Sequence, residues 1–212
     1  MVTSRTAYYE ALRELALSKR TEFDVKTAGF GLREARQIYR AEAITIDRRP
    51  LPSCLKAIYM CDEVDVSVAI RIGLPMEPTL FALVHELKHH WADQELVRAG
   101  YVTCGDYNQN ELVEKGAEVF AAEFIYPVAE FSDDIKSLGD GKWDVDKIIR
   151  FKREVCRAKV SYTFVRKRLE RLGLVSRDQF DGVKFQKREE EIYGTPLYKQ
   201  RWFRDRRRAR TS

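Results

Sequence analysis

Apolar side chains recur along the first 75 residues with two different periods. Helical spacing predicts an amphipathic helix over residues 7–18 and a second helix over residues 32–43. Residues 56–61 form a short apolar run. Over residues 64–72, apolar positions alternate strictly with polar or small ones, which is typical of a strand. This part of the chain therefore combines helices with a short sheet.

The helical period returns in two further segments. One helix is predicted over residues 78–93, where Pro78 suits a first helical turn. The next is predicted over residues 110–125, and Pro127 prevents its continuation. Each segment carries one apolar stripe, so we expect each helix to pack one face into a core.

The last third of the chain changes character. Residues 132–142 are polar, contain two glycines and read as a linker. Residues 144–158 and 162–172 then predict two helices joined as in a helix-turn-helix. We therefore expect an α+β, predominantly helical fold in three parts: a domain with a short β-sheet (residues 1–130), a helix-turn-helix-like module (143–175) and a basic, disordered tail (187–212).

Composition limits the class of protein. Hydrophobic residues make up 44% of the 212 residues, which is enough for a packed core. No apolar run reaches 18 residues, and residues 1–20 lack the apolar centre of a signal peptide, so we expect a cytoplasmic protein without a membrane segment. The four cysteines lack CxxC spacing and are expected to be free thiols: Cys54, Cys61, Cys104 and Cys156.

Charge is distributed unevenly around the net value of +5. Residues 1–146 have a net charge of −8, whereas residues 147–172 have +8 and residues 187–212 have +5. Trp202 and Phe203 lie among the arginines of the last segment, a combination that suits phosphate contacts and base stacking. The two basic segments therefore suggest nucleic-acid contact. The alternative is a solvated helix face and a solubilising tail.

The strongest chemical signal is His85-Glu86-Leu87-Lys88-His89, an H-E-x-x-H pattern. Residues four apart on a helix lie on one face, so His85 and His89 can reach one Zn²⁺, with Mn²⁺ or Fe²⁺ as alternatives. Glu86 flanks that face and can act as a general base toward water. His90 points elsewhere, and we expect it to face solvent or to support the site indirectly.

A catalytic zinc requires a third protein ligand and one open position. No histidine follows His90, so this ligand must be Asp, Glu or Cys. Glu114 and Glu118 are four apart, so one can bind metal while the other orients a ligand histidine. The candidates on this helix are Glu111, Glu114, Glu118 and Glu123, with Cys104 as a weaker alternative. Tyr101, Tyr107 and Tyr126 are candidate donors to a reacting carbonyl.

Residues 114–127 resemble the second motif of the ImmA/IrrE metallopeptidase family, which reads Glu-x-x-Ala-Asn-x-Phe-Ala-x-x-Leu-Leu-x-Pro in most members. The first family motif, a helix with H-E-x-x-H after a strand, also matches. Residues 160–174 are similar to the family's helix-turn-helix-like segment. The resemblance covers roughly residues 30–175, and two motifs in the right order are more specific than either alone.

The resemblance implies a small zincin-like domain of the gluzincin type. It makes His85, His89 and Glu114 the metal ligands and Glu86 the base. Two departures bear on the site: Glu118 stands where the family usually has Asn, and Lys88 replaces a common Gly.

Family members cleave helix-turn-helix repressors. The resemblance therefore implies a zinc endopeptidase that cuts an XRE-type repressor and derepresses mobile-element, stress or DNA-damage genes. The competing interpretation is a nucleic-acid-associated regulatory protein with a metal site and no turnover. Glu86 argues against it, because a purely structural metal site needs no base.

Overall fold

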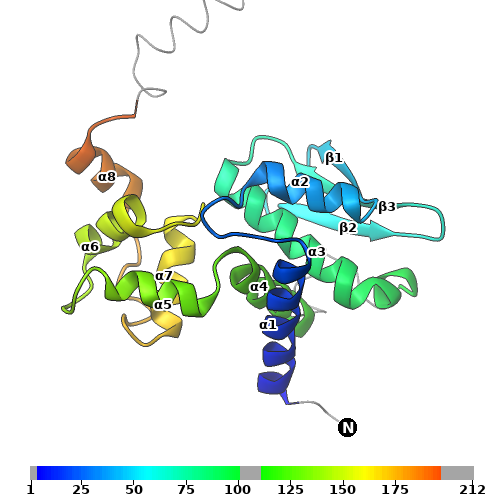
Figure 1. Cartoon of the computed structure of the whole chain (residues 1–212). Helices are drawn as coiled ribbons and strands as arrows, with labels where there is room; N and C mark the ends of the chain where they lie inside the picture. The colour runs from blue at the N-terminus through cyan, green and yellow to red at the C-terminus, as the bar shows by residue number, and fades with distance from the viewer. Residues whose placement is uncertain (1–3, 101–110, 197–212) are drawn as a thin grey trace, which may run out of the picture. The chain divides into compact units, whose positions relative to one another are not determined.

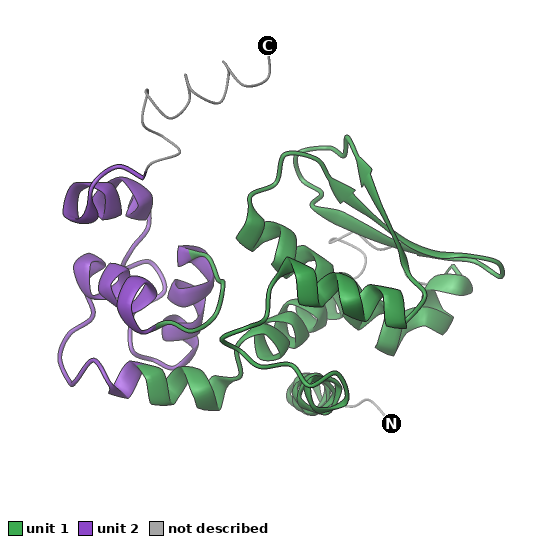
Figure 2. Ribbon diagram, turned by 45° about the horizontal axis from the view of Figure 1, so that its top comes forward, with its two compact units in different colours: residues 1–134, 156–161 green, residues 135–155, 162–212 purple. Residues whose placement is uncertain are grey.

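The computed structural model describes residues 4–100 and 111–196. It divides into two compact units: unit 1 is formed within residues 1–134 and 156–161, and unit 2 within residues 135–155 and 162–212 (Figures 1 and 2). Unit 1 contains the sheet and the helices around it. Unit 2 is helical, so the fold is α+β and predominantly helical, as the sequence predicts.

The sheet of unit 1 has three strands in the order β1-β3-β2. Strand β3 (Val66–Arg71) lies in the centre, parallel to β1 (Thr45–Arg49) and antiparallel to β2 (Ala57–Cys61). Val68, Ala69 and Ile70 are all buried, so both faces of the central strand are covered. The sequence predicts β2 and β3 but not β1, because β1 is a largely exposed edge strand with only one apolar residue.

Five helices of the described structure lie wholly or mostly in unit 1, and α2 and α3 pack against its sheet (Figure 1). They are α1 (Arg5–Glu22), α2 (Leu32–Ala41), α3 (Met76–Arg98), α4 (Glu111–Ile125) and α5 (Val128–Lys136). Helices α1 to α4 correspond to predicted helices, with α3 extending five residues further than expected. Helix α5 was missed: much of it falls in the predicted linker, because Phe131 is its only fully buried side chain.

Two contacts fix α4 within unit 1. Trp91 of α3 packs against Phe120 and Phe124 of α4, with ring centroids 5.8 and 6.0 Å apart. On another face of α4, a Cβ added at Gly116 would lie 2.7 Å from Leu12 Cδ1, closer than side chains tolerate. Glycine at position 116 therefore allows α1 to approach α4 closely.

Unit 2 contains α6 (Val145–Arg150), which continues as a π-helical turn over Phe151–Val155, then α7 (Tyr162–Arg171) and α8 (Phe185–Tyr193). The two helices predicted over 144–158 and 162–172 are present, although the first ends at Val155 and is not α-helical throughout. The functional division into residues 1–130, 143–175 and 187–212 stays a prediction.

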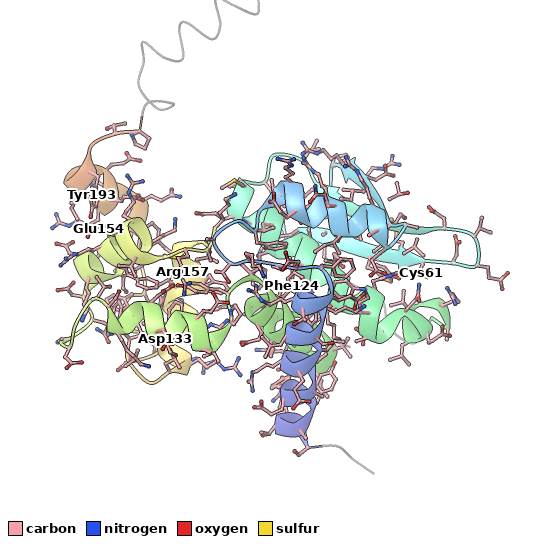
Figure 3. All side chains as sticks on the ribbon, viewed as in Figure 1. Cys61, Phe124, Asp133, Glu154, Arg157 and Tyr193 are labelled. Atoms are coloured by element: carbon pink, nitrogen blue, oxygen red, sulfur yellow. The ribbon has the colours of Figure 1, made fainter. Side chains whose placement is uncertain are left out.

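Helix α8 corrects the expectation of disorder from residue 187 onward. The ring of Phe185 stacks on Tyr162 at 5.0 Å, and Arg188 forms an ion pair with Asp146 at 2.7 Å. Tyr193 donates a hydrogen bond to Glu154 at 2.8 Å, and Figure 3 labels both residues. High charge suggested a solvated chain, but here several charged side chains pair within unit 2. No described helix has the length and apolarity required to cross a bilayer.

Candidate metal centre

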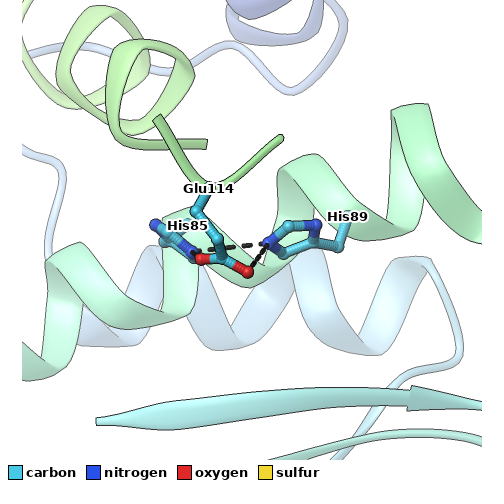
Figure 4. Close-up of side chains that lie close together, drawn as sticks. All are labelled: His85, His89 and Glu114. Carbon is cyan, nitrogen blue, oxygen red and sulfur yellow. Dashed lines mark hydrogen bonds and ion pairs between the residues drawn. The ribbon is translucent and has the colours of Figure 1, made fainter. Parts of the chain in front are cut away.

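Helix α3 supplies three of the predicted site residues and α4 supplies the fourth. His85 and His89 are one helical turn apart and face the same side, with ring centroids 5.2 Å apart. Glu114 lies in the first turn of α4, and its carboxylate reaches the two imidazoles (Figure 4). The structure thus brings together side chains that are 29 residues apart in sequence.

The distances suit one small cation. Glu114 Oε2 lies 3.1 Å from His85 Nε2, and Glu114 Oε1 lies 3.9 Å from His89 Nε2. The two imidazole Nε2 atoms are 3.4 Å apart. Tetrahedral ligands at roughly 2.1 Å from a zinc ion are about 3.4 Å from one another. The three side chains can therefore hold a metal ion with little rearrangement.

The surroundings of the cluster favour positive charge. His89 and Glu114 are almost fully buried, whereas the His85 side chain is 15% exposed, which leaves an approach from solvent. Burial alone would lower the pKa of His85. The hydrogen bond with Glu114 and the charges of Glu86, Glu114 and Glu118 outweigh it and raise that pKa above its ordinary value. A site that stabilises a charged imidazole also favours a bound cation.

Glu86 is buried beside the cluster, with 4% of its surface exposed. Burial raises the pKa of its carboxyl, although nearby His85 and His89 oppose the shift. Its Oε2 atom has no hydrogen-bond partner among the described residues. A buried carboxylate oxygen without a protein partner is costly in a purely structural setting, which makes Glu86 a candidate for a functional role.

Asp93, which was not among the predicted site residues, contacts His89. Asp93 Oδ2 lies 2.7 Å from His89 Nδ1. If Nδ1–H donates to this carboxylate, Nε2 is left with its lone pair toward Glu114 and a metal. The signal was present in the sequence, because Asp93 follows His89 by four residues on the same helix. Lys88, also buried, lies 2.5 Å from the same oxygen.

The other glutamates considered as ligands lie elsewhere. Glu111 is exposed and forms an ion pair with Arg5 at 3.3 Å. Glu123 is buried, but its Oε1 accepts a hydrogen bond from the backbone N–H of Val128 at 2.9 Å, at the start of α5. Glu118 is half-buried and acts on His85 through its charge; it does not belong to the group of three whose ligand atoms meet.

The remaining candidates have separate positions. His90 Nδ1 lies 3.1 Å from the Tyr59 hydroxyl and its Nε2 lies 3.2 Å from Glu42, away from the cluster. Tyr126 donates its hydroxyl hydrogen to Asp134. Cys104, Tyr101 and Tyr107 lie outside the described residues.

Residues 68–170 match the model of the family described as the IrrE N-terminal-like domain, a peptidase family. The similarity to this family therefore covers just under half of the chain. The match extends from β3 through α3 and α4 into α7, so it includes both motif helices and confirms the resemblance to the ImmA/IrrE family. The match supports a metallopeptidase-like domain, and the His85, His89 and Glu114 side chains form a group that could hold a metal ion.

Among solved structures, the chain is similar to a Mycobacterium tuberculosis transcriptional regulator, with a TM-score of 0.52 and 18% sequence identity. The similarity covers 85% of this chain and 52% of the regulator, so the chain spans about half the length of that protein. At this identity the comparison shows a shared fold. No curated protein matches the chain.

Proposed function

We propose that this protein is a metal-dependent endopeptidase, with His85, His89 and Glu114 as metal ligands and Glu86 as the general base. Zn²⁺ is the expected ion, with Mn²⁺ or Fe²⁺ as alternatives. The observation that carries the proposal is the convergence of two imidazoles and one carboxylate beside Glu86, whose buried Oε2 atom has no partner within residues 4–100 and 111–196. Two histidines and one glutamate leave a fourth position open, as hydrolytic zinc sites require.

The reaction follows from these roles. When bound, the divalent cation polarises a peptide carbonyl and lowers the pKa of water to about 7. Glu86 takes one proton as the water oxygen forms a bond with the carbonyl carbon. When the carbon–nitrogen bond breaks, Glu86 delivers that proton to the leaving amine. Asp93 keeps the His89 ring in position throughout by accepting its Nδ1 hydrogen.

Strand β2 offers a place for an extended peptide. It is an edge strand of the described sheet and packs against α3. The Glu86 carboxylate accepts a hydrogen bond from the backbone of Tyr59 in the middle of β2. A substrate segment that pairs with β2 would therefore run close to Glu86, held by main-chain hydrogen bonds.

The proposed substrate is a helix-turn-helix repressor of the XRE type, cut to derepress mobile-element or stress genes. Its support is the ImmA/IrrE relationship. We also propose that the basic segments 147–172 and 187–212 contact DNA phosphates. Such contacts would bring the enzyme to a regulator that is bound to DNA.

The test is a cleavage assay with purified XRE-type repressors from the genome that encodes this chain. The metal-loaded protein is compared with Glu86→Gln, which keeps the shape of the side chain but cannot accept the proton. We expect one or few specific cuts by the wild type, equal metal content in both proteins and a loss of cleavage in the variant. Cleavage by Glu86→Gln at the wild-type rate would refute the proposed mechanism.

The second candidate is a nucleic-acid-associated regulator with a metal site and no turnover. The basic segment of unit 2 favours it, but part of that charge is neutralised within the unit. Arg166 pairs with Asp181 at 2.8 Å, and Arg153 with Glu189 at 3.5 Å. Metal binding without cleavage of any repressor, together with salt-dependent binding to DNA, would favour this candidate.

A further inference from the structure

We propose that unit 1 contains a second ligand site, away from the metal cluster, for a small organic anion with an apolar body. The site is a cavity of about 350 Å³ between α2, β1, β3 and α3. Small-molecule sites in proteins have volumes of roughly 300–1,000 Å³. Figure 1 shows α2 beside β1, the two elements that form its rim.

The floor of the cavity is apolar. Ile44, Ile70 and Leu83 are 6%, 4% and 2% exposed, so they present fixed surfaces that belong to the core. Ile46 of β1 is half-buried and adds a fourth apolar wall. Such a floor favours a hydrocarbon or aromatic group over a fully hydrated ion.

The hydroxyl groups in the lining are already engaged. Tyr39 donates its hydroxyl hydrogen to the Leu83 carbonyl at 2.8 Å. Thr79 donates to the Pro75 carbonyl at 2.8 Å. The polar recognition of a ligand would therefore depend on the other polar side chains of the lining, which are all arginines.

Three guanidinium groups surround the cavity: Arg36 and Arg40 from α2 and Arg48 from β1. Within residues 4–100 and 111–196, none of the three has a carboxylate partner at ion-pair distance. The neighbouring Arg49, which is not part of the lining, does pair with Asp47 at 2.9 Å. This contrast is notable because residues 1–146 carry a net charge of −8, so acidic partners are abundant in this part of the chain.

The geometry of β1 explains the contrast. Alternate residues of a strand point to opposite faces, so Ile46 and Arg48 face the cavity, whereas Asp47 and Arg49 face away from it. Arg36 and Arg40 are four apart on α2 and share a helix face. Three like charges over one apolar floor are most favourable when an anion lies between them. A carboxylate, phosphate or sulfonate group accepts the paired hydrogen bonds that guanidinium groups donate.

An occupant would also touch the catalytic helix. Leu83 of the floor lies on α3 only two residues before His85. The ligand is therefore placed to influence the helix that carries the metal cluster without entering the cluster. The binding itself is independent of peptidase activity, and it can be measured whether or not the proposed enzyme function holds.

The test uses 8-anilinonaphthalene-1-sulfonate, a fluorescent aromatic sulfonate, and N-phenyl-1-naphthylamine, which has the same rings without the charge. Fluorescence titrations are made with the full chain and with Arg36→Gln, Arg40→Gln and Arg48→Gln. Arg49→Gln is the matched control, because it removes the same charge from β1 on the opposite face. Circular dichroism checks that each variant is folded.

We expect one sulfonate per chain, and affinity about tenfold lower in each of the three lining variants, since a charge-assisted hydrogen bond is lost. Affinity in Arg49→Gln should stay within about twofold of the wild type, and the neutral probe should be insensitive to all four substitutions. No saturable binding of the sulfonate, or equal losses in Arg49→Gln and the lining variants, would overturn the proposal. Binding of a hexaglutamate peptide in preference to the aromatic sulfonate would overturn the assignment to a small apolar anion.

Discussion

Lys88 Nζ lies 2.5 Å from Asp93 Oδ2, and both side chains are buried. The same carboxylate oxygen lies 2.7 Å from His89 Nδ1. Lys88 Nζ is also 3.2 Å from the carbonyl of Val113, the residue before Glu114. The Lys88 ammonium group therefore contacts both the carboxylate that pairs with His89 and the backbone next to Glu114. This hydrogen bond holds α3 and α4 together beside the His85–His89–Glu114 group.

Replacing Lys88 with Met should destabilise the fold by about 3–5 kcal/mol, because the Asp93 carboxylate would remain buried without its cation. Urea denaturation of the metal-free protein measures the free energy of unfolding. The double variant Lys88→Met/Asp93→Asn should recover part of the loss, since no uncompensated charge remains. A double variant less stable than Lys88→Met alone would contradict this account.

Asp93→Asn should weaken metal binding by about 10–100-fold, because the amide no longer fixes the His89 ring with its Nε2 lone pair toward the cluster. Competition with a chromophoric chelator measures the dissociation constant. Asp47→Asn is the control, because Asp47 is half-buried, lies on β1 and pairs only with Arg49 in the described structure. Equal metal affinity in the two variants would show that the hydrogen bond to His89 has no role in binding.

Glu114→Ala should abolish stoichiometric metal binding, because only two imidazole ligands would remain. Glu118→Ala, four residues further along the same helix, should keep one metal per chain. Elemental analysis of both purified variants distinguishes the two carboxylates. Full metal content in Glu114→Ala with loss in Glu118→Ala would transfer the ligand role to Glu118.

Part of this site could be predicted from the sequence because its signals are local. The H-E-x-x-H spacing and the apolar stripes of α3 and α4 follow from helical geometry alone. Asp93 carried a local signal too, at four residues from His89, but a lone aspartate near a helix end is usually solvated. The bridge from Lys88 to Val113 depends on how α3 packs against α4, and no sequence period encodes that contact.

The missed elements have the same explanation. Strand β1 is recognisable only once β3 offers its hydrogen-bonding edge, because its residues are mostly charged or exposed. Helix α8 contains three consecutive glutamates and is stabilised by contacts of Phe185, Arg188 and Tyr193 with other parts of unit 2. The secondary structure of β1 and α8 depends on tertiary contacts, whereas their local composition is typical of solvent-exposed, irregular chain.

The basic end of the chain can be tested without disturbing α8. Removal of residues 197–212 deletes six net positive charges together with Trp202 and Phe203. If this segment binds nucleic acid, log affinity for duplex DNA should fall with log salt by about 0.9 per neutralised phosphate, and truncation should flatten the slope. Titrations of both proteins at several salt concentrations measure it. Equal slopes, or no binding by either, would leave a solubilising extension, and repressor cleavage should be unaffected.

The close approach of α1 to α4 at Gly116 bears on where the domain that holds the proposed metal site begins. The family match starts at residue 68, yet α1 ends at Glu22 and packs against the helix that supplies Glu114. A fragment cut to the matched segment would expose the apolar side of α4 and lose the support of Glu114. The shortest fragment expected to fold with the proposed metal site therefore includes α1, far upstream of both sequence motifs.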